Sequence, residues 1–210
     1  RCLARGHRLN RSDTELAMKL ASIYRRTERE RDALAVLDLC LREGGDDPEV
    51  LWEAGLTAHL AESYAAAVTY FGAYEEQQPG RPWVHYYLAS CLLEVHQFDE
   101  ARHVVEIEAE RNPDAHLAID VLRAAAASGL GDMETAIQSI HAVLALKIYE
   151  IDYLTSQGIS SLFGILWRFT SPVIEQSPEL KQQIEDYMIA SGLAPHDIFR
   201  SDRGKRETVE

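Results

Sequence analysis

Apolar positions along the chain recur at intervals of three and four residues, which is the spacing of one face of an α-helix. Segments with this spacing follow one another in pairs, separated by short polar turns or by proline. Helix starts are expected at Ser12, at Asp47–Pro48 and at Gly131–Asp132, because Ser and Asp cap helix N-termini and proline fits the first turn. The pattern predicts an all-α chain built from pairs of amphipathic helices.

The helix pair repeats along the chain with a period close to 34 residues. An alanine recurs after 34, 34 and 35 residues, at Ala33, Ala67, Ala101 and Ala136. A large apolar residue follows each alanine by four positions, at Leu37, Phe71, Val105 and Ile140. A small side chain is needed where two helices cross, since a larger one would push their axes beyond the ~8 to 10 Å of packed helices.

This pattern resembles the tetratricopeptide repeat (TPR), in which antiparallel helix pairs stack into a right-handed superhelix. The resemblance implies a right-handed superhelical stack with four repeats in residues 1–147, at about 14–45, 48–79, 82–113 and 115–147. Three units depart from the family pattern, the second of them by Ala54 and Ala58 where bulkier residues are usual. The first has a charged run around Glu30 where an aromatic residue is usual, and the fourth has one extra residue near Gly129–Gly131.

Residues 148–194 are predicted to form C-terminal capping helices, because a stack of repeats must cover its last apolar face. The apolar segment Ile151–Phe169 is expected to pack against the second helix of the fourth repeat. Ser177–Pro178 starts a second capping helix, with Gly192 as its stop. Residues 195–210 have little to bury and are predicted to form a mobile tail.

The charge of the chain is strongly negative and unevenly distributed. The net charge is −13, yet residues 1–42 hold 10 Lys or Arg against 6 Asp or Glu, which leaves an excess of 17 negative charges beyond them. Such a surface repels phosphate backbones and anionic lipid headgroups, so we expect no nucleic-acid binding by the repeat body and no membrane binding. No apolar run approaches the roughly 18 residues that a membrane-spanning helix requires.

The three cysteines, Cys2, Cys40 and Cys91, form no CxxC pair and are odd in number. They suggest neither a disulfide framework nor a zinc site, and a reducing, cytoplasmic location fits them best. Cys40 and Cys91 lie in apolar helical patterns and are expected in the core.

Motifs that carry enzymatic chemistry are missing from the sequence. There is no HExxH, GxGxxG, phosphate-binding Gly-Lys-Ser/Thr or GxSxG segment, and no two histidines form an i, i+4 pair. We therefore predict no catalytic residue, no metal site and no cofactor, and hence a protein that is not an enzyme.

The resemblance implies a surface for a partner. In the family, the first helix of each pair lines the concave face and binds the partner. Matching the units assigns ten residues to this face: Met18, Ser22, Arg25, Trp52, Leu56, His59, Tyr86, Ser90, Leu93 and Asp120, with Ala124 beside the last. Aromatic anchors there would hold a peptide or an amphipathic helix. Whether Trp52 and Tyr86 contact a ligand or pack against neighbouring repeats stays open.

One subfamily grips chaperone C-termini with a cluster of Lys, Asn and Arg on this face. The matching positions here are Met18, Ser22, Glu53, Leu56, Trp83 and Tyr87. That clamp is absent from the sequence, so a chaperone-tail adaptor is disfavoured.

Two functions are compatible with these patterns. The first is a non-enzymatic protein–protein interaction module that binds a peptide or amphipathic helix in the concave groove, with a basic or amphipathic partner favoured by the acidic exterior. The alternative is a C-terminal regulatory or sensor domain of a larger bacterial transcription regulator or signalling protein, because residues 178–193 are similar to endings of such proteins and the chain begins with Arg1 as a fragment would. A homodimer stays an alternative to a monomer, and the sequence does not identify the partner.

Overall fold

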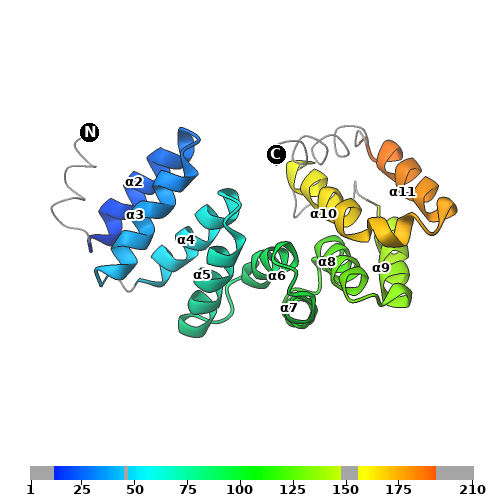
Figure 1. Ribbon diagram of the computed structural model, residues 1–210, viewed down its shortest axis with the longest axis horizontal. Coiled ribbons are helices and arrows are strands. Elements are labelled where there is room, and N and C mark those ends of the chain that lie inside the picture. The colour runs from blue at the N-terminus through cyan, green and yellow to red at the C-terminus, as the bar shows by residue number, and fades with distance from the viewer. Residues whose placement is uncertain (1–11, 45–46, 148–155, 193–210) are drawn as a thin grey trace, which may run out of the picture. The chain divides into compact units, whose positions relative to one another are not determined.

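The computed structural model describes residues 12–44, 47–147 and 156–192, and these residues form helices with no β-strand among them (Figure 1). The helices are α2 (Thr14–Arg26), α3 (Glu30–Arg42), α4 (Pro48–Leu60), α5 (Tyr64–Gln77), α6 (Val84–Glu94), α7 (Phe98–Arg111), α8 (His116–Gly129), α9 (Met133–Ala145), α10 (Ser156–Ile174) and α11 (Pro178–Ala190). The all-α prediction is confirmed. Each of the four predicted repeat ranges holds one helix pair. The predicted tail, residues 195–210, lies outside the described residues.

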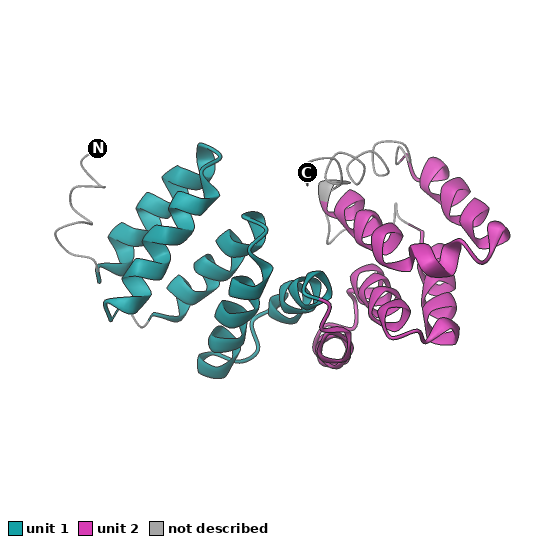
Figure 2. Cartoon of the chain, viewed as in Figure 1, with its two compact units in different colours: residues 1–95 teal, residues 96–210 magenta. Residues whose placement is uncertain are grey.

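The chain divides into two compact units, residues 1–95 and residues 96–210 (Figure 2). The first unit contains α2 to α6 and the second contains α7 to α11. The division falls between the two helices of the third predicted repeat. In the first unit each helix packs against the next one along the chain, and α4 also contacts α2 and α6.

Side-chain oxygens cap several helix N-termini. Asp13 accepts a hydrogen bond from the Leu16 N–H at 2.9 Å, so α2 starts one residue later than a cap at Ser12 would place it. Asp47 caps α4 through the Glu49 N–H at 2.9 Å, and Asp132 caps α9 through the Thr135 N–H at 3.1 Å. Each carboxylate satisfies a backbone N–H that has no partner within its helix.

In every helix pair, the short connection between the two helices contains one residue with a positive φ. These residues are Glu28 (54°), Glu62 (57°), His96 (60°) and Gly131 (75°), and each lies two positions after the end of the first helix. The turn of the fourth pair is therefore no longer than the others, and its extra residue is accommodated before the turn. Only Gly131 lacks a Cβ, so the left-handed conformation costs the other three residues roughly 1 to 2 kcal/mol each.

The small residues lie where the repeat period predicts close contact. The four repeat alanines, Ala33, Ala67, Ala101 and Ala136, have no exposed surface. A Cβ added at Gly55 on α4 would lie 2.6 Å from the Phe71 ring on α5, and one added at Gly129 on α8 would lie 2.3 Å from the Phe98 ring on α7. These approaches are shorter than any van der Waals contact. In both places, therefore, an aromatic ring on the second helix of a pair fits only against a residue without a side chain.

Helix α10 does not continue the stack. It packs mainly along α8, the first helix of the fourth pair, and contacts α9 less, so the prediction that this segment packs against the second helix was wrong. The physical reason is the composition of α8, whose buried residues include the run Ala124–Ala127 and lie almost all round the helix. A helix that is apolar on every side must be covered on every side, and alanines allow a close approach. Helix α11 packs against α9 and α10.

The buried alanines should not tolerate larger side chains. We expect Ala67→Leu to lower the free energy of unfolding by ~1 to 3 kcal/mol, because the added atoms have no space at the crossing of α4 and α5. Urea unfolding followed by circular dichroism at 222 nm measures the change. Ala65→Leu, at an exposed position of the same helix, is the matched control and should stay within about 0.5 kcal/mol of the wild type. Equal stabilities of the two variants would contradict the crossing argument.

Candidate partner-binding surface

The ten predicted partner-binding residues lie on four helices. Nine of them are on α2, α4 and α6 of the first unit, and Asp120 is on α8 of the second. Within each helix they are three or four residues apart and so share one face. Helix α4 contacts both α2 and α6, so the three faces belong to neighbouring helices, and we call them together the A-helix face.

The structure divides these residues by exposure. Met18, Ser22, Arg25, Leu56, His59 and Tyr86 are half-buried, so each presents part of its side chain to solvent. Ser90 is 4% exposed and Leu93 is fully buried. The prediction that Ser90 and Leu93 offer a surface to a partner is therefore wrong for this conformation, because both side chains lie in the interior.

Trp52 belongs to the core. Only 8% of its surface is exposed, and its ring centroid lies 5.5 Å from that of Phe71, 5.7 Å from Tyr74 and 5.7 Å from Tyr87. The guanidinium of Arg81 covers the indole at 4.2 Å from the ring centroid. Of the two possibilities that the sequence left open for Trp52, the structure favours packing: its ring lies among the aromatic residues of α5 and α6, and Arg81 covers one face of it.

An ion pair crosses the A-helix face. Arg25 on α2 and Glu53 on α4 approach to 2.6 Å, with 26% and 24% of their side chains exposed. Their charges offset each other where they meet, so Arg25 is engaged within the chain. The sequence pattern named Arg25 but not its partner, because the two residues are 28 positions apart and in different repeats.

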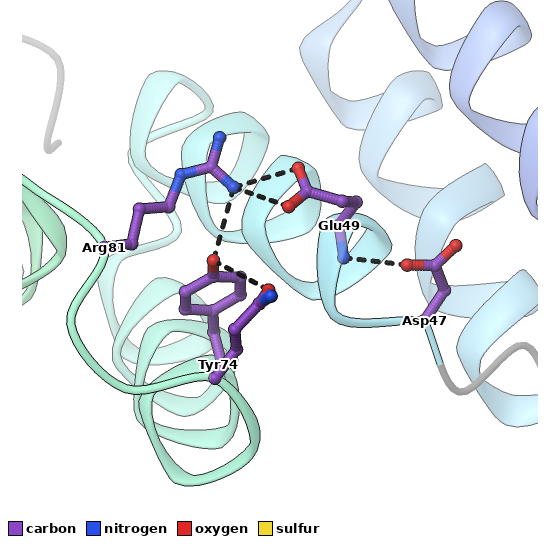
Figure 3. Close-up of polar contacts among 5 residues, drawn as sticks. Asp47, Glu49, Tyr74 and Arg81 are labelled. Carbon is purple, nitrogen blue, oxygen red and sulfur yellow. Dashed lines mark hydrogen bonds and ion pairs between the residues drawn. The ribbon is translucent and has the colours of Figure 1, made fainter.

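Arg81 makes several polar contacts near this face, and the sequence pattern did not single it out. It lies in the connection between α5 and α6, outside the repeat helices. Its Nη1 donates to both carboxylate oxygens of Glu49, at 2.8 and 2.9 Å, and lies 3.4 Å from the Tyr74 hydroxyl (Figure 3). Glu49 and Trp52 are one turn apart on α4, so a single arginine covers a carboxylate and an indole of the same helix face.

His59 and Cys91 form the pair most similar to a catalytic dyad, with 3.4 Å between Nδ1 and Sγ. Burial raises the pKa of the Cys91 thiol to about 12 and lowers the pKa of the His59 imidazole below 6.5. Both groups are therefore neutral near pH 7. Because the thiolate is the nucleophile in cysteine catalysis, this pair is not set up to attack a substrate.

In the fourth repeat, the residues that correspond to the A-helix face are covered or paired within the chain. Asp120 is bound to Arg123 at 3.0 Å, and Arg123 also donates from Nε and Nη2 to Glu106 at 2.8 and 2.9 Å. Ala124 has no exposed surface, and α10 lies along α8. The chain itself therefore covers much of the helix that was expected to contact a partner.

The described residues contain no group of three or more His, Cys, Asp or Glu side chains arranged to hold a metal ion. Among the described helices, none combines the length and the hydropathy needed to span a bilayer.

Comparisons with known proteins identify the repeat. Residues 58–119 match a family model described as the tetratricopeptide repeat. The fold is similar to that of MamA, residues 41 to the end, from Desulfovibrio magneticus RS-1, with 21% identity, 84% of this chain and 96% of that chain covered, and a TM-score of 0.62. It is also similar to YrrB, described as a TPR protein with an unusual peptide-binding site, with 16% identity, 97% and 98% coverage, and a TM-score of 0.59.

A thermophilic TPR protein from Thermus thermophilus shares 16% identity over 84% of this chain and 99% of that chain, with a TM-score of 0.50. The sequence matches no curated protein. At these identities the solved structures establish the fold class, a TPR helical-repeat solenoid, and they lend no support to the alternative of a regulatory domain.

Truncation of Trp52 should destabilise the fold. We expect Trp52→Ala to lower the free energy of unfolding by about 3 to 5 kcal/mol, because it leaves a cavity among Phe71, Tyr74 and Tyr87. The measurement is urea unfolding followed by circular dichroism. Ser22→Ala, on the same face but half-buried, should stay within about 0.5 kcal/mol of the wild type. A Trp52→Ala protein as stable as Ser22→Ala would show that the indole is not part of the core.

His59 should make the stability depend on pH. Its pKa in the folded chain lies below 6.5, so the unfolded chain binds the proton more readily as the pH falls. The stabilising contribution of the neutral ring is therefore complete above pH 6.5 and is lost as the pH falls through the folded-state pKa. We expect His59→Gln to flatten the decline in the free energy of unfolding between about pH 7 and about pH 5, measured by urea titrations. Parallel profiles for His59→Gln and the wild type would contradict the role given to His59.

Proposed function

Because the chain is a tetratricopeptide-repeat protein, we propose that it is a non-enzymatic protein–protein interaction module that binds a peptide or an amphipathic helix of a partner on the A-helix face of its first unit. The partner surface consists of the half-buried side chains of α2, α4 and α6. Their residues are Met18, Ser22, Arg25, Leu56, His59 and Tyr86.

The observation that carries the proposal is the difference between the two units. In the second unit α10 packs along α8, so the chain covers that first helix itself. In the first unit six of the nine predicted residues keep part of their surface exposed on three neighbouring helices. The A-helix face of the first unit therefore offers the repeat surface to which a separate segment can bind.

The chemistry of this face suits a partner with apolar anchors. Met18, Leu56 and Tyr86 supply apolar contact area, whereas Ser22 and His59 can exchange hydrogen bonds with a peptide. The Arg25–Glu53 pair leaves little free charge where α2 meets α4. Because the chain beyond residue 42 carries an excess of 17 negative charges, its long-range field favours basic partners during association. The likeness to YrrB is compatible with peptide binding.

The test uses peptides selected from a phage-displayed random library on the immobilised chain, with dissociation constants measured by calorimetry. We expect Ser22→Tyr and Tyr86→Ala to weaken binding of the selected peptides by about tenfold or more, because one variant adds bulk to the A-helix face and the other removes an anchor. Thr69→Tyr, at an exposed position of α5, is the matched control and should bind as the wild type does. Loss of binding in Thr69→Tyr with unchanged binding in the two A-helix variants would place the partner elsewhere and contradict the proposal.

A further inference from the structure

The side chain of Arg81 fills a site made by α4 and α5. The Trp52 ring lies 4.2 Å and the Tyr74 ring 5.6 Å from its guanidinium carbon, and both oxygens of Glu49 accept hydrogen bonds from it. Aromatic faces and a carboxylate are the groups that bind organic cations in proteins. We call Glu49, Trp52 and Tyr74 the Arg81 cage; Figure 3 shows Glu49 and Tyr74 of this cage with Arg81.

The cage is held by parts of the molecule that do not depend on Arg81. Trp52 and Tyr74 come from two helices that pack together, and the rings of Phe71 and Tyr87 support the indole from other sides. Asp47 caps α4 through the backbone N–H of Glu49, which fixes the start of the helix that carries the carboxylate. The groups that would contact a cation are therefore positioned before the cation arrives.

The occupant, by contrast, does not come from a helix and is partly exposed. Arg81 belongs to the connection between α5 and α6, next to exposed Gly80 and Pro82, and its ion pair with Glu49 leaves the two side chains 32% and 49% exposed. Water screens an ion pair of this kind, so it adds little to stability. All hydrogen bonds of the Arg81 side chain to described residues come from Nη1. A guanidinium free of the loop can instead place two nitrogens on the two carboxylate oxygens, which is the stronger arrangement.

The cage is continuous with the A-helix face. Glu49, Trp52, Leu56 and His59 follow one another at spacings of three, four and three residues on α4 and so form one row along the helix. A peptide lying along this row reaches the cage at the N-terminal end of α4. A side chain of that peptide can enter the cage only if it displaces the side chain of Arg81.

We propose that Glu49, Trp52 and Tyr74 form a guanidinium-binding site that Arg81 occupies in the free protein and that an arginine side chain of the partner occupies in the complex. Arginine fits better than lysine, because a planar guanidinium stacks on an indole and pairs with a carboxylate through two nitrogens at once. The identity of the occupant rests on the proposed function, whereas the affinity of the cage for a guanidinium does not.

The test removes Arg81 and supplies a guanidinium in solution. N-acetyl-arginine amide is titrated into Arg81→Ala and into the wild type, and the indole N–H signal of Trp52 is followed by ¹H–¹⁵N NMR, with Trp52→Phe used to assign it. We expect a saturable shift in Arg81→Ala with an affinity about tenfold or more above that of the wild type, because no internal arginine competes. N-acetyl-citrulline amide, which has the same shape without the charge, should not bind.

A second substitution tests the cage directly. Glu49→Gln in the Arg81→Ala background should reduce the affinity for N-acetyl-arginine amide about tenfold or more, since the carboxylate is lost. Arg81→Gln keeps most of the aliphatic stem over Trp52, and it replaces Arg81→Ala if the latter does not give a folded spectrum. The proposal is overturned if no saturable shift appears in a folded Arg81 variant, if the citrulline compound binds equally well, or if Glu49→Gln has no effect.

The outcomes for the site and for the function are separable. Binding of N-acetyl-arginine amide without any selected peptide on the A-helix face would support the cage and contradict the interaction module. Peptide binding on the A-helix face without arginine binding in the Arg81 variants would support the module and overturn the cage.

Discussion

The close crossing of helices at residues with little or no side chain is the constraint on which the rest of the structure depends. Ala67 is fully buried where α4 and α5 meet, and Gly55 has no room for even one carbon beside the Phe71 ring. This spacing lets the large residues of one helix fill the grooves of the next. It also places the aromatic ring of Trp52 where Tyr74, Tyr87 and Arg81 surround it.

Much of the fold could be predicted because the residues that pack the repeats together recur in the sequence at a fixed period. The alanines at 34 and 35 residue intervals and the large residue after each predicted an all-α chain of helical repeats, and the described residues form helices. The position of α10 could not be predicted in this way. Its apolar residues show that it must be buried, but they do not indicate which helix it packs against. It packs along α8 because α8 is apolar on almost every side. That burial is evident only once the neighbours of α8 are known.

The partner-binding surface was less predictable than the fold for a related reason. Matching repeats puts Met18, Trp52 and Tyr86 at equivalent positions of their helices, but burial depends on what reaches each face from outside the repeat helices. Arg81 comes from a connection with no periodic pattern, so nothing in the sequence indicated that it covers the indole. Pairs such as Arg25 with Glu53 likewise join different repeats and leave no local signal.

The packing of α10 on α8 has an evolutionary consequence. Repeat arrays become longer when a helix pair is added. Each added pair must pack against the repeat before it and the repeat after it, so those surfaces must not be covered by other helices. A pair inserted directly after α9 would separate α8 and α9 from the helices that now cover them. A copy of the α2–α3 or α4–α5 pair would leave the packing of α10 on α8 untouched, so this arrangement accommodates added repeats within the first unit more readily than after α9.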